Sequence, residues 1–105
     1  MTDKLALGVR LRESDLPLVS RGGGASTTRL VNRSIGAKTI LNGITNIPPG
    51  GAIPLHYHNC EESVLVLSGD GVAVLGNDEV QVTSGDVTWI PPEMPHQFKN
   101  SSDQD

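Results

Sequence analysis

The sequence contains few of the residues that stabilise small proteins through cross-links or large aromatic side chains. Of its 105 residues, one is a cysteine, Cys60, and only Tyr57, Trp89 and Phe98 are aromatic. A single cysteine cannot form an internal disulfide, so a reducing compartment is expected and the cytoplasm is the predicted location. With so few aromatic side chains, the core must be built from Val, Ile and Leu.

Two further absences exclude classes of function. No apolar run approaches the roughly 20 residues of a membrane-spanning helix, and the interrupted N-terminus does not read as a signal peptide. Acidic residues outnumber basic ones by 12 to 8, the formal net charge is −4, and no Lys/Arg run occurs. The sequence therefore argues against a membrane protein and against nucleic acid as a partner.

Turn-forming residues are abundant. Twelve glycines and seven prolines punctuate short stretches rich in β-branched and other apolar residues. Such short strands at regular turn spacing predict an all-β sandwich or small barrel and no substantial helix. The expected strands span residues 28–33, 39–47, 55–59, 63–67, 72–75, 80–83 and 87–90.

The chain is long enough for one small domain. Residues 1–27 carry scattered charges, Pro17 and the run Arg21-Gly22-Gly23-Gly24-Ala25-Ser26, which reads as a flexible joint. We therefore assign residues 1–27 to an N-terminal arm, packed on a neighbouring surface or mobile, and residues 28–105 to the barrel domain.

The candidate site centres on two closely spaced histidines. His56 and His58 lie two residues apart, Glu62 follows, and the third histidine of the chain is His96. On a strand, residues two apart point to the same face. Two imidazoles on one face, a nearby carboxylate and a distant imidazole form a plausible set of ligands for a divalent metal.

These residues also stand in a pattern that resembles the two motifs of the cupin superfamily. The first motif is matched by Gly50, His56, His58, Glu62 and Gly69; the second is matched by Gly85, Pro91, His96 and Asn100, with Glu93 in place of a glycine. The resemblance covers about half of the chain. It implies a cupin-type jelly-roll β-barrel in which His56, His58, Glu62 and His96 bind one divalent metal ion.

The chain departs from the cupin pattern at two places. Glu93 disfavours the positive φ that glycine would permit, so we expect a different turn before His96 while the ligand is kept. Cupins usually continue beyond the second motif, whereas this sequence stops in a polar tail after Asn100. We expect the N-terminal strands or a partner chain to cover the open edge, unless the sequence lacks its natural end.

Three imidazoles and one carboxylate suit Fe, Mn, Co, Ni, Cu or Zn and leave coordination positions for a ligand. The net positive charge of such a site favours a small anionic or chelating oxygen ligand. The first hypothesis is a metalloenzyme, namely a dioxygenase, isomerase or lyase, although no catalytic acid–base pair can be assigned. The alternative is a non-catalytic module that binds or senses a small molecule or metal.

Three residues are candidates for substrate contact, each with a plainer alternative. Cys60 is an even number of residues from His56 and His58, so it would share their face on a strand. Alternatively, it could be a small buried residue. Phe98 could line the pocket or pack in the core, and Arg29 could hold a carboxylate or be solvated. The small size and open edge, together with the tendency of cupins to dimerise, predict a homodimer that pairs through residues 1–47.

Overall fold

Eight strands account for the regular structure of the computed structural model, which describes residues 8–101. The helical elements among these residues are two 3-10 turns, so none of the described helices could cross a membrane. The all-β prediction is confirmed. The elements are η1 (Glu13–Asp15), β1 (Leu18–Gly22), β2 (Ala25–Val31), η2 (Arg33–Ile35), β3 (Asn42–Asn46), β4 (Glu62–Leu65), β5 (Asp70–Leu75), β6 (Asp78–Thr83), β7 (Val87–Ile90) and β8 (His96–Lys99).

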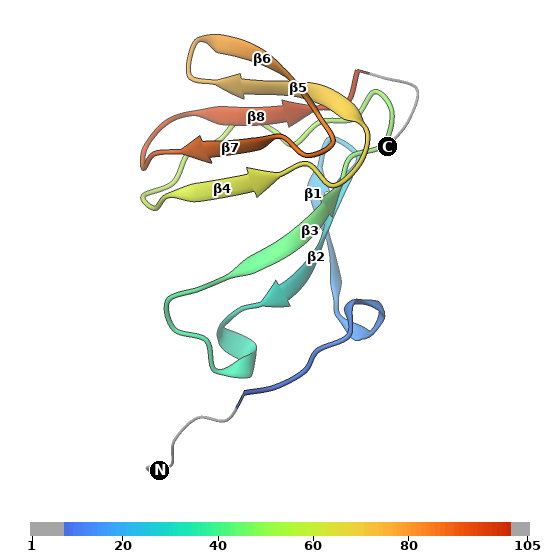
Figure 1. Ribbon diagram of the computed structural model, residues 1–105, viewed down its shortest axis with the longest axis vertical. Helices are drawn as coiled ribbons and strands as arrows, with labels where there is room; N and C mark the ends of the chain where they lie inside the picture. The colour runs from blue at the N-terminus through green and yellow to red at the C-terminus, as the bar shows by residue number, and fades with distance from the viewer. Residues whose placement is uncertain (1–7, 102–105) are drawn as a thin grey trace.

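The strands form three antiparallel sheets. β1, β2 and β3 make one sheet in that order, β4 pairs with β7, and β5 lies between β6 and β8. Strands β4 to β8 gather in one body, from which the β1–β2–β3 sheet extends toward the N-terminus (Figure 1). Continuous strand pairing does not join the three sheets among the described residues.

Isolated bridges connect these parts. Ala52 bridges Gly24 in parallel and Lys99 in antiparallel fashion, and His56 bridges His96. The predicted strand at residues 55–59 is therefore wrong as a regular strand, because only His56 within it makes a bridge and the chain bends at residues 59–60. Pro54 contributes to this irregularity, since it has no N–H to donate to a ladder.

The N-terminal part also differs from the prediction. Strand β1 and the start of β2 fall within residues 18–27, which we had assigned to the arm, and residues 1–7 lie outside the described residues. The supposed flexible joint is a tight turn in which Gly22, Gly23 and Gly24 all have positive φ. A Cβ on Gly23 would overlap the carbonyl oxygen of Ala52, so glycine permits this close approach.

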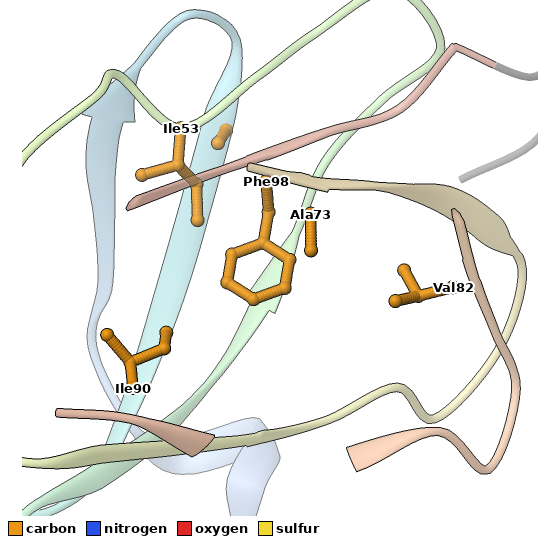
Figure 2. Packing of buried hydrophobic residues seen from close by; sticks show 6 residues of the cluster. Ile53, Ala73, Val82, Ile90 and Phe98 are labelled. Carbon is orange, nitrogen blue, oxygen red and sulfur yellow. The ribbon is translucent and has the colours of Figure 1, made fainter. Parts of the chain in front are cut away.

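The hydrophobic core is small and lies in the body formed by β4 to β8 and the chain packed on it. Figure 2 shows the ring of Phe98 pointing into the middle of the buried cluster. Alternation along β7 illustrates the pattern, since Ile90 is 0% exposed whereas its neighbour Trp89 is 58% exposed. The buried hydrophobic residues of this core are Ala25, Ile53, Ala73, Val82, Ile90 and Phe98.

Candidate metal centre

The four side chains that the sequence predicts as metal ligands lie together. One ligand atom from each comes within 4.8 Å of all the others, and the residues are His56, His58, Glu62 and His96. They come from three separate segments, namely the chain before β4, the first residue of β4 and the first residue of β8. Folding therefore brings together residues that are up to 40 positions apart in the sequence.

Backbone pairing sets the relation between His56 and His96. The N–H of each residue donates to the carbonyl of the other, at 3.1 Å from His56 and 2.8 Å from His96. Directly opposed residues of an antiparallel pair project to the same face. The two imidazole rings accordingly meet edge to face, with their centroids 4.2 Å apart.

Glu62 completes the cluster from the start of β4. Its Oε1 lies 2.8 Å from Nε2 of His58 and 3.4 Å from Nε2 of His96. The side chains of His58 and Glu62 are 32% and 33% exposed, whereas that of His96 is 1% exposed. His96 thus lies at the floor of the cluster, and the other two residues lie nearer the solvent.

The backbone also selects the tautomer of each histidine. The three Nδ1 atoms lie beside carbonyl oxygens, at 2.8 Å for Pro54 and His56, 3.2 Å for Cys60 and His58, and 2.9 Å for Met94 and His96. A carbonyl oxygen only accepts, so each Nδ1 is assigned as the protonated donor. In the neutral imidazoles, the Nε2 lone pairs are then free to bind a metal.

The residues present fit a divalent metal ion. Nε2 of His96 is buried and has no hydrogen-bond partner, which is a costly state for a polar atom. In the assigned tautomers, the Nε2 lone pairs point toward the carboxylate oxygens of Glu62. Both groups are hydrogen-bond acceptors, so a cation between them would stabilise the arrangement. Nitrogen and carboxylate donors in this number match the preferences of first-row divalent metals.

The turn before His96 corrects one prediction. Glu93 adopts φ of +72°, so the positive-φ turn is retained with glutamate in the position of glycine. We had expected a different turn type. The backbone N–H of Glu93 donates to the carbonyl of His58 at 2.7 Å, and this bond stabilises the unfavourable conformation.

The candidate substrate residues occupy different environments. Cys60 is exposed at a bend, and its Sγ lies 3.6 Å from Nδ1 of His58. Phe98 packs in the hydrophobic core with 8% exposure, and Arg29 is exposed on β2. The structure thus places Cys60 beside the cluster and Phe98 within the core.

The groups that orient the histidines could not be predicted from the sequence. The carbonyls of Pro54, Cys60 and Met94 receive the three Nδ1–H groups, and a main-chain carbonyl leaves no signature in residue type. Asn100 donates from Nδ2 to the carbonyl of Ile47 at 2.7 Å, a contact between residues 53 positions apart in the sequence.

Comparisons with known proteins identify a matching family model and several similar proteins. Residues 43–105 match the family model of the cupin domain. Auxin-binding protein 4 of Zea mays is 33% identical over 79 residues, which cover 67% of this chain and 39% of that protein. The chain spans about half or less of the length of the first curated relatives that it matches.

Two solved structures share the fold. The polyketide cyclase RemF from Streptomyces resistomycificus superimposes with a TM-score of 0.81 at 25% identity, over 93% of this chain and 73% of that one. A cupin-2 domain protein from Rhodospirillum rubrum gives a TM-score of 0.77 at 22% identity, over 95% and 70% of the two chains. These likenesses confirm the predicted fold class.

Proposed function

Because the chain belongs to the cupin family, as its match over residues 43–105 shows, we propose that it binds one divalent metal ion and acts through that ion on a small molecule. The proposed ligands are His56, His58, Glu62 and His96. The observation that carries the proposal is the buried, unpartnered Nε2 of His96, which lies beside the carboxylate of Glu62.

The charge of the site indicates the class of small molecule. Glu62 contributes one negative charge and the neutral histidines contribute none, so a divalent ion would leave the centre with a net positive charge. This favours an anionic or chelating oxygen ligand such as a carboxylate, an enolate or a hydroxy-ketone. The partly exposed side chains of His58 and Glu62 leave a side from which such a ligand can approach.

We infer that the protein is a metalloenzyme for an oxygen-rich metabolite, with isomerase, lyase or dioxygenase chemistry. When bound, the metal supplies Lewis-acid polarisation of the ligand or, if it is iron, access to dioxygen. The residues of the chain orient the imidazoles through the three carbonyls and keep Nε2 of His96 away from water. The similarity to a polyketide cyclase supports an enolisable carbonyl compound as the substrate.

A non-catalytic binding module is the second candidate. The relatives include proteins named for binding auxin rather than for a reaction. In addition, the ionisable side chains near the cluster in the described part of the chain do not form an evident acid–base pair. Cys60 and Tyr57 are both exposed, and Glu93 contacts His58 through its backbone.

Metal analysis tests the central proposal. The protein is purified from cultures that are supplemented in turn with each first-row divalent metal, and its metal content is measured by mass spectrometry. One equivalent is expected in the wild type and in Tyr57→Phe, a control at an exposed neighbouring residue, and His58→Ala should lose it. Absence of stoichiometric metal from the wild type under every supplement would disprove the proposal.

Reaction class is then tested on the metal-loaded protein. Oxygen uptake with an enolisable substrate would support a dioxygenase, and product formation without oxygen uptake would support isomerase or lyase chemistry. Saturable binding of a small chelating anion without turnover would support the binding module instead.

We further propose that the chain works as a homodimer in the cytoplasm. Support for the dimer comes from the exposed apolar side chains of Leu18, Ile40 and Leu41. These residues lie on or beside the strands of the β1–β2–β3 sheet, which extends away from the rest of the strands (Figure 1). The free thiol of Cys60 supports a reducing compartment. Size-exclusion chromatography with light scattering should give twice the 11.1 kDa chain mass, and a monomer would contradict the dimer.

A further inference from the structure

Two buried side-chain atoms among the described residues lack a hydrogen-bond partner. They are Nε2 of His96 and Oγ1 of Thr88. The proposed metal ion would account for the first atom, but the second belongs to a residue outside the four-residue cluster. Buried hydroxyl groups are nearly always paired, so the hydroxyl of Thr88 requires its own explanation.

Strand pairing places Thr88 on the same inner face as the metal ligand Glu62. Along β4 and β7, Glu62 is opposite Ile90 and Val64 is opposite Thr88. The alternate residues of β7, Val87 and Trp89, are 62% and 58% exposed, so Thr88 and Ile90 point inward. The Glu62–Ile90 pair and the Val64–Thr88 pair form two levels, which lie two residues apart along the strands. This spacing corresponds to about 7 Å.

The inner-face residues of these two strands differ in exposure. Ile90 is 0% exposed, whereas Glu62, Val64 and Thr88 are all half-buried although they share the inner face. A small molecule held at the four-residue cluster would have Val64 and Thr88 as its neighbours one level further along these strands. Rotation about the Cα–Cβ bond of Thr88 exchanges its hydroxyl and methyl positions between staggered rotamers.

We propose that Thr88 is a second anchoring residue of the ligand site, which hydrogen-bonds a further oxygen of a molecule that chelates the metal. This inference rests on the proposed function and specifies the ligand as a polyoxygenated compound, such as a linear polyketone. The hydroxyl of Thr88 can donate to a carbonyl oxygen or accept from an enol. Val64, which lies opposite Thr88 at the same level, suits the apolar carbons next to that oxygen.

A pair of matched probes tests the inference by calorimetric titration of the zinc-loaded, full-length protein. Diacetylacetone and butyrylacetone share a chelating β-diketone and a seven-carbon chain, but only diacetylacetone has a third carbonyl. The wild type should bind diacetylacetone about threefold to tenfold more tightly, the effect of one net hydrogen bond. Thr88→Val should abolish this difference, and Thr88→Ser should restore it.

Ser63→Ala is the matched control, because it removes a hydroxyl from the exposed outer face of the same two strands. It should keep the preference for diacetylacetone. A preference that persists in Thr88→Val would overturn the inference, as would zinc-loaded wild type that binds neither compound. Failure of the wild type to bind zinc would overturn the proposed function, and the inference with it.

Discussion

The carbonyl oxygen of His58 accepts a hydrogen bond from the backbone N–H of Glu93, at 2.7 Å. Among the described residues, Glu93 is the non-glycine residue that has a positive φ. The next residue, Met94, supplies the carbonyl that orients His96. One strained turn thus connects the segment that carries His58 with the segment that carries His96. The geometry of the cluster depends on this turn as well as on the ligand side chains.

Glu93→Gly should stabilise the protein. Relief of the left-handed strain is worth about 1–2 kcal/mol, and the greater unfolded-state freedom of glycine offsets roughly half of it. We expect a gain of about 0.5–1 kcal/mol in the free energy of unfolding, measured by urea titration. Gln81→Gly on the exposed strand β6 is the control and should lose stability. An equal loss in both variants would contradict the strain at Glu93.

The sequence predicts which four side chains lie together, but it does not predict their surroundings. His56, His58, Glu62 and His96 are recognisable because a metal site requires particular residue types at fixed spacing. The orienting carbonyls are not recognisable, since every residue has one. Likewise, Gly22–Gly24 read as a flexible joint, although all three have positive φ in a tight turn and Ala52 closely approaches Gly23. Such tertiary contacts override local signals.

The core and the surface should respond very differently to loss of an aromatic side chain. Phe98 is 8% exposed in the core, and Trp89 is 58% exposed on the outer face, where its Nε1 donates to Glu61. Phe98→Ala should cost about 3–5 kcal/mol of unfolding free energy. Trp89→Ala should cost about 1 kcal/mol or less. Chemical denaturation of both variants checks this, and similar losses would mean that Trp89 is buried in an assembly.

The buried amide of Asn100 should matter more than an exposed one. Asn100 is 5% exposed and donates to the carbonyl of Ile47, which ties the end of β8 to the chain after β3. Asn100→Ala leaves that carbonyl without this donor and should cost about 1–3 kcal/mol in urea unfolding. Asn46→Ala, at an exposed position of β3, should cost about 0.5 kcal/mol or less. Equal costs would show that the Asn100 bond is unimportant.

Metal should stabilise the fold, because the four proposed ligands come from separate segments of the chain. At about 100 times its dissociation constant, zinc should add about 2.7 kcal/mol, which corresponds to roughly 10–20 °C in melting temperature. Differential scanning fluorimetry with zinc and then with a chelator measures the shift.

Glu62→Gln separates the charge of this ligand from its shape. The substitution keeps the side-chain volume but removes the negative charge, so a tenfold weaker site would reduce the zinc-induced shift by about half at the same concentration. Glu61→Gln is the control, since Glu61 bonds Trp89 on the outer face and should leave the shift unchanged. If Glu62→Gln unfolds without zinc, Glu62 is structural. If both variants keep the full shift, zinc binds elsewhere and the cluster is not the metal site.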